Sequence, residues 1–194
     1  MGRDKATLDV AGVTLLDRTL AGLPAEVDVI VAGPPVAVAR SGVRFVQEDP
    51  PGGGPVAGID AALAAVSAPV VVVLATDLPL VGTLPASLVD ALANGDDGAP
   101  GPDAVLALDA AGRPQQLCAA YRTDALRRAI DENGSANGAA MRSVVARLHM
   151  STPLSVIAVR EVRGETVEVD PTWDIDTPED LHALEHLFDE ADDD

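Results

Sequence analysis

Lys5 is the only lysine in a chain of 194 residues, whose other 12 basic residues are all arginine. An ammonium group is a compact point charge that can sit among phosphate oxygens, whereas a guanidinium presents a planar fork. Lys5 lies in the opening run MGRDK, and residues so close to a chain end are commonly just solvated. Lys5 is therefore a candidate phosphate-binding residue if the other motifs of the chain support that role.

A single carboxylate, Asp77, comes directly after the most apolar segment of the chain, residues 69–75. In open α/β sheets, ligands bind outside the carboxyl ends of the strands, so Asp77 leaves the sheet where sites are found. A carboxylate there can hold Mg²⁺, which favours one or two carboxylates together with waters and substrate phosphates. An Asx-turn or a helix cap explains the same residue equally well.

Three consecutive glycines, Gly52 to Gly54, stand before a helix expected from residue 56. Such a run lets the backbone approach a ligand closely, and the helix start directs N–H groups and a partial positive charge outward. The loop is not a Walker A motif, because no Gly-Lys-Ser/Thr follows. A loop without a ligand is the alternative interpretation.

Two further acids, Asp174 and Asp176, alternate with the apolar Ile175, so that the acids share one face. They precede a well-signalled helix start, in which Thr177 is the expected N-cap and Pro178 takes the first helical position. The pair could orient a metal or a substrate, although a purely capping role needs no ligand at all.

The elements that must position these residues alternate between strand and helix patterns. This alternation predicts an α/β fold, a three-layer α/β/α sandwich around a mostly parallel, Rossmann-like sheet. We expect one domain over residues 1–188 and an acidic tail over 189–194. The expected strands cover 27–32, 43–46, 69–75, 104–108, 117–121 and 154–159, and the expected helices cover 15–23, 56–66, 85–93, 123–132, 139–148 and 178–188.

The composition excludes several classes of protein. The formal net charge of −18 argues against nucleic acid or an anionic membrane as a partner, since both require a basic face. The single cysteine, Cys118, cannot form an internal disulfide, and no apolar run is long enough to span a bilayer. A cytoplasmic protein is expected.

Five motifs in order resemble those of the MobA-type molybdenum cofactor guanylyltransferases, which are nucleotidyltransferases of the nucleotide-diphospho-sugar transferase type. The opening MGRDK is similar to the second half of the family's signature LAGGxSxRMGxDK. The segments GPVAG (54–58) and TDLP (76–79) are similar to its GPLAG segment and Asp-x-Pro metal motif. The stretch 115–121 is similar to its Gln-Pro-Leu region, and DIDTPED (174–180) to its NxNTPED motif.

The resemblance implies roles for particular residues. Lys5 would bind the nucleotide phosphates, Asp77 would hold Mg²⁺, and both would be catalytic. The nucleotide would also be contacted by Asp49, Gly54, Gly58 and Asp77. Asp174 and Asp176 would lie on the side of the acceptor substrate, molybdopterin, and Asp176 could assist the metal.

The chain departs from the family pattern in three ways that matter. Ala32 ends its expected strand where some members place a nucleotide-binding asparagine. Aspartates replace asparagines at positions 174 and 176, which adds negative charge beside two phosphorylated substrates. The glycine-rich first half of the opening signature, with the strand before it, is not present, and we expect that a native beginning precedes Met1. A form without that glycine loop is expected to be inactive or unstable.

The implied reaction transfers GMP from GTP to the phosphate of molybdenum-molybdopterin and releases pyrophosphate. Proteins of the molybdenum cofactor pathway and molybdoenzymes are the implied partners. The alternatives are a related cytidylyltransferase, an enzyme for a sugar or polyol phosphate, and a non-catalytic paralogue. The base and the acceptor cannot be chosen from these motifs.

Overall fold

The computed structural model describes residues 5–94, 101–155, 158–162 and 165–189. Its central sheet contains three strands in the order β5 (Val70–Leu74), β7 (Pro114–Arg122) and β6 (Ala104–Leu108). β7 runs antiparallel to both neighbours. A turn over residues 109–113 joins β6 to β7, and so short a connection can join only antiparallel strands.

The sheet is thus more mixed than the mostly parallel arrangement expected from the sequence. β5 and β6 share one direction because both oppose β7, and a second sheet pairs β3 (Ile30–Ala32) with β4 (Arg44–Val46) in parallel. Isolated parallel bridges join β6 to Met150 and Leu154. β7 is therefore the strand that departs from the expected direction.

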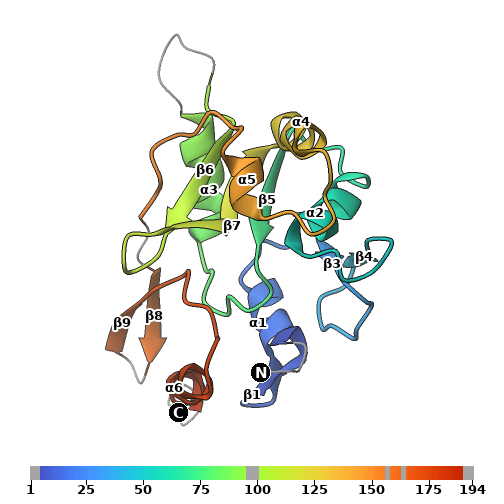
Figure 1. Ribbon diagram of the computed structural model, residues 1–194. Helices are drawn as coiled ribbons and strands as arrows, with labels where there is room; N and C mark the ends of the chain where they lie inside the picture. The colour runs from blue at the N-terminus through green and yellow to red at the C-terminus, as the bar shows by residue number, and fades with distance from the viewer. Residues whose placement is uncertain (1–4, 95–100, 156–157, 163–164, 190–194) are drawn as a thin grey trace.

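Helices cover both faces of the central sheet, which gives the expected three layers (Figure 1). On one face, Leu106 and Tyr121 pack against three helices: α2 (Pro55–Leu63), α4 (Thr123–Asn133) and α5 (Met141–Val145). On the other face, Val105 and Ala120 pack against α3 (Leu84–Ala93). Adjacent residues of β6 are buried on opposite faces, as expected for a strand covered on both sides.

A third apolar cluster joins the two ends of the described chain. A 3₁₀ turn (Lys5–Thr7) leads into the short strands β1 (Asp9–Val10) and β2 (Val13–Thr14) and then into α1 (Leu15–Ala21). Val10 and Leu15 are fully buried with Ile175 and with Leu184 of α6 (Pro178–Asp189). This cluster places the segment before α6 beside the start of the chain.

The expected helices all form, with ends that differ by a few residues. The largest shortening is in the segment 139–148, where the helix covers only Met141–Val145. Of the strand expected over 154–159, Leu154 makes one bridge, residues 156 and 157 are not described, and residues 158 and 159 begin an unforeseen antiparallel hairpin, β8 (Ala158–Val162) with β9 (Glu165–Val169). Charged residues interrupt the apolar pattern of these two strands, so the sequence pattern did not predict the hairpin.

Two expectations fall largely outside the described residues. The acidic tail was expected from residue 189, but α6 includes Asp189, and residues 190–194 are not described. The first four residues of the MGRDK motif are likewise outside. Within the described part of the chain, no helix is long and apolar enough to cross a membrane.

Candidate functional site

Lys5, Asp77 and Asp176 come together in the structure although they are far apart in the sequence. The Lys5 Nζ lies 3.3 Å from Asp77 Oδ2 and also donates a hydrogen bond to Asp176 Oδ1. The Lys5 and Asp77 side chains are 29% and 17% exposed, whereas the Asp176 side chain is 61% exposed. The ammonium therefore bridges a sheltered carboxylate and an open one.

Asp77 is positioned by the end of β5 and by a buried hydroxyl from α1. The backbone N–H of Ala75 donates to the Leu117 carbonyl at 2.8 Å, which keeps the chain attached to β7 up to that point. The Thr19 hydroxyl has one proton to donate and three carbonyl oxygens within reach, those of Leu15 in its own helix at 3.0 Å, Leu78 at 3.1 Å and Thr76 at 3.4 Å. Thr19 thus brings α1 into contact with the backbone on both sides of Asp77.

Sequence reasoning missed Thr19. The signal that could have found it is a polar residue on the otherwise apolar face of α1, between Leu15 and Leu20. Thr19 is only 4% exposed, and buried hydroxyls are expected to have hydrogen-bond partners. Its partners on a distant loop identify it as a positioning residue for Asp77.

Asp174 and Asp176 lie on the face that their alternation predicted. Ile175 between them is fully buried in the cluster that joins the chain ends, and both acids are exposed. The expected N-cap also forms: the Thr177 hydroxyl lies 2.7 Å from Asp180 Oδ2 and accepts from the Asp180 N–H at 3.1 Å. This capping box holds the backbone beside Asp176.

The charges in this cluster perturb one another's pKa values. The hydrogen bond to Asp176 is the main cause that raises the pKa of Lys5, and the same bond is the main cause that lowers the pKa of Asp176. Burial, followed by the charge of Asp176, raises the pKa of Asp174. The ammonium thus stabilises the charged form of Asp176, while Asp174 beside it is held towards its neutral form.

The glycine segment has its own internal partner. Glu48 Oε1 accepts hydrogen bonds from the N–H groups of Gly52 at 2.9 Å and Gly53 at 3.2 Å. A bond from its own backbone N–H is the main cause that lowers the pKa of the Glu48 carboxyl, and the two glycine bonds add to it. Sequence reasoning did not single out Glu48, and its carboxylate occupies two of the N–H groups that the loop was expected to offer a ligand.

The other predicted nucleotide contacts occupy different local settings. Asp49 is exposed in the loop after β4, and Gly54 caps the start of α2 with a φ of 85° that favours glycine. Gly58 is buried, and a Cβ added there would approach the Ala32 Cβ at 3.2 Å. Close packing of α2 on β3 is thus a structural reason for Gly58.

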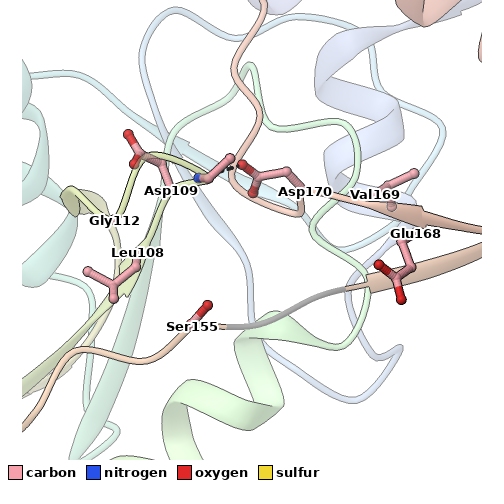
Figure 2. A pocket seen from close by; sticks show the side chains of 8 residues that line it. Leu108, Asp109, Gly112, Ser155, Glu168, Val169 and Asp170 are labelled. Atoms are coloured by element: carbon pink, nitrogen blue, oxygen red, sulfur yellow. Dashed lines mark hydrogen bonds between the residues drawn. The ribbon is translucent and has the colours of Figure 1, made fainter.

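A pocket of about 410 Å³ lies between the β6–β7 turn and the end of β9 (Figure 2). Its lining includes Leu108, Asp109, Ser155 and Asp170. Asp170 Oδ2 accepts from the backbone N–H of Ala110 at 3.0 Å and so joins the two sides of the pocket. None of the residues of the Lys5 cluster lines it.

The sequence matches the family model of the MobA-like NTP transferase domain over residues 1–152. No curated protein is significantly similar to the chain in sequence.

Solved structures with the same fold include a cytidylyltransferase and a protein of molybdopterin-guanine dinucleotide biosynthesis. The 2-C-methyl-D-erythritol 4-phosphate cytidylyltransferase of Thermus thermophilus is 26% identical with a TM-score of 0.65, over 95% of this chain and 94% of that one. The molybdopterin-guanine dinucleotide biosynthesis protein A of Archaeoglobus fulgidus is 20% identical with a TM-score of 0.64, over 97% and 92%. These likenesses confirm the nucleotide-diphospho-sugar transferase fold expected from the sequence.

Proposed function

The chain belongs to the MobA-like NTP transferase family and is a nucleotidyltransferase, and on this premise we propose that it transfers GMP from GTP to molybdenum-molybdopterin. The observation that carries the proposal is the approach of the lone lysine to Asp77 at the carboxyl end of β5. The likeness of the GPVAG segment (54–58) to the GPLAG segment of the guanylyltransferases supports the choice of GTP. The proposed setting is the cytoplasm, with proteins of the cofactor pathway as partners.

The donors of the site fit Mg²⁺, which is the cofactor we propose. Mg²⁺ requires hard oxygen ligands and only one or two carboxylates, and Asp77 with Asp176 offers those. Among the described residues no group of three or more acids, histidines or cysteines is arranged to hold a metal by itself. When bound, Mg²⁺ would neutralise phosphate charge and make the α-phosphate a better electrophile.

The reaction joins the terminal phosphate of molybdopterin to the α-phosphate of GTP and expels pyrophosphate. Such transfers depend on positioning and charge neutralisation more than on covalent work by the protein. Lys5 would bind phosphate oxygens and stabilise the charge that develops on them. Asp77 would hold the metal, while Asp49, Gly54 and Gly58 would border the nucleotide and Asp174 and Asp176 the acceptor.

A cytidylyltransferase is the second candidate. The observation that favours it is the 26% identity with the cytidylyltransferase of Thermus thermophilus over 95% of this chain. A related enzyme for a sugar or polyol phosphate would use the same Lys5 and Asp77. A non-catalytic paralogue is favoured by the Glu48 carboxylate on the glycine segment, because that carboxylate competes with a phosphate.

Thermal shift with GTP, CTP or ATP in the presence of Mg²⁺ distinguishes these candidates. A ligand at one hundred times its Kd stabilises a protein by about 2.7 kcal/mol, so selective binding is visible as a selective rise in Tm. We expect GTP to give the largest rise. A larger rise with CTP would favour the second candidate, and no rise with any nucleotide would favour the non-catalytic one.

A further inference from the structure

Asp176 is the more exposed of the two carboxylates that contact Lys5. Lys5 donates to Asp77 and Asp176 together, and the bond to Asp176 links residues 171 positions apart in the sequence. The two carboxylates take two of the three donors of the ammonium. A phosphate that needs more than the one remaining donor must therefore displace a carboxylate.

The charges oppose that displacement when no cation is present. Asp77 and Asp176 contact the ammonium, and both also act electrostatically on Asp174, which adds a third carboxylate to the site. A triphosphate adds further negative charge to this surplus. Like charges a few ångströms apart repel each other, and the repulsion is stronger near a protein surface than in bulk water.

Resting on the function proposed above, we propose that Asp176 withholds Lys5 from phosphate until a divalent cation occupies its carboxylate, so that the cation binds before the nucleotide. Asp77 and Asp176 would hold the cation, and Lys5 would then lose its contact with Asp176. Asp176 is the partner that can exchange, because its side chain is 61% exposed and Asp77 is 17% exposed. It is thus a positioning residue that sets the order of binding.

The lone lysine makes this proposal measurable without any nucleotide. Lys5 carries the only side-chain amine, so its acylation by an N-hydroxysuccinimide acetate can be followed by mass spectrometry and told apart from the α-amino group. Acylation of the whole 194-residue chain is compared at one pH in Mg²⁺ and in sodium chloride of equal ionic strength. An exposed ion pair contributes at most about 1 kcal/mol, so releasing Lys5 should raise its acylation rate roughly two- to fivefold.

The substitution Asp176→Asn keeps the shape of the side chain and removes its charge. We expect this variant to acylate at the faster rate without Mg²⁺ and to lose the response to Mg²⁺. Asp90→Asn, on the exposed side of α3, makes the same change of net charge and should behave like the original chain. In metal-free buffer, equilibrium dialysis should also show tighter GTP binding to Asp176→Asn than to the original chain.

Equal acylation rates in Mg²⁺ and sodium chloride would overturn the proposal, as would an Asp176→Asn variant that acylates at the original rate. These results are independent of the proposed function. If Mg²⁺ releases Lys5 but no form binds a nucleotide, the nucleotide-transfer function is wrong and the exchange at Lys5 stands. If GTP is turned over normally while Mg²⁺ leaves the acylation rate of Lys5 unchanged, the proposed binding order is wrong and the proposed function stands.

Discussion

The Lys5 ammonium, 3.3 Å from Asp77, should be far more important for nucleotide transfer than for folding. Lys5→Ala is expected to lower kcat about 100-fold or more, the usual cost of losing one group that stabilises transition-state charge. Its cost in stability should stay near or below about 1 kcal/mol because the ion pairs are partly exposed. Lys5→Arg should also be poor, since a guanidinium cannot reproduce a point contact. Kinetics and urea unfolding of both variants check this prediction, and normal turnover by an Arg variant of an active form would refute it.

Asp77 is predicted to be the principal Mg²⁺ ligand. Asp77→Asn keeps the shape of the side chain but removes the charge, so the Mg²⁺ concentration for half-maximal activity should rise about tenfold or more. Titration of Mg²⁺ against activity measures this shift. Asp60→Asn on α2 makes the same change of charge at an exposed position and serves as the control. An unchanged half-saturating concentration would leave Asp77 with a structural role in the turn.

At the scale of elements, Arg40 closes the end of α1. Its guanidinium donates to the carbonyl oxygens of Leu23 at 3.0 Å and Pro24 at 2.7 Å, and also to three others in the segment 20–27. A lysine cannot reproduce this fork, so Arg40→Lys should destabilise the fold by about 1 to 2 kcal/mol. Urea unfolding should show a lower midpoint with an unchanged slope. Arg128→Lys, at an exposed position of α4, should leave the midpoint in place.

The start of α6 provides a second prediction at this scale. Thr177→Ala removes the hydroxyl that accepts from the Asp180 N–H, and loss of such a cap costs about 1 kcal/mol. Because the same cap adjoins Asp176, Thr177→Ala should also weaken the contact between Asp176 and Lys5. Thr177→Ser should restore both properties, as judged by thermal unfolding and by the acylation rate of Lys5. A Thr177→Ser variant as unstable as Thr177→Ala would show that the methyl group, rather than the hydroxyl, matters.

At the scale of the whole molecule, Cys118 reports whether the central sheet is intact. Burial on β7, with the charge of Asp170 as a second cause, raises the pKa of the Cys118 thiol from 9.0 to about 12. Native protein near pH 8.5 should therefore resist iodoacetamide, whereas protein unfolded in urea should react readily. Rapid alkylation of the native protein would contradict the buried position of Cys118.

The same shift predicts how stability changes with pH. The unfolded chain loses the Cys118 proton near pH 9.0 and the folded chain only near 12, so this contribution to stability is complete below 9.0 and is lost as the pH rises towards 12. Burial also raises the pKa of Tyr121, so the two groups act in the same direction. Cys118→Ala separates them: the loss of unfolding free energy between about pH 8 and 10.5 should be smaller in the variant.

Several features could be predicted from the sequence because they depend on neighbours along the chain. The apolar run of β5 and the amphipathic helices follow from periodicity, which reports the face that each element buries. The cap at Thr177 follows from residue types three positions apart. The burial of Ile175 between two exposed acids follows from alternation alone. Resemblance to a family then predicted that Lys5 and Asp77 belong to one site, and the two side chains lie 3.3 Å apart.

Other features were decided only by tertiary structure. The approach of Asp176 to Lys5 depends on the apolar cluster that packs Ile175 and Leu184 against Val10 and Leu15. The bond of Glu48 to the glycine segment was likewise absent from the local patterns. Periodicity and caps report the surface that an element buries but not the partner that buries it. Which distant segments meet is decided by the packing of all the apolar faces at once, because that packing alone offsets the entropy of closing long loops.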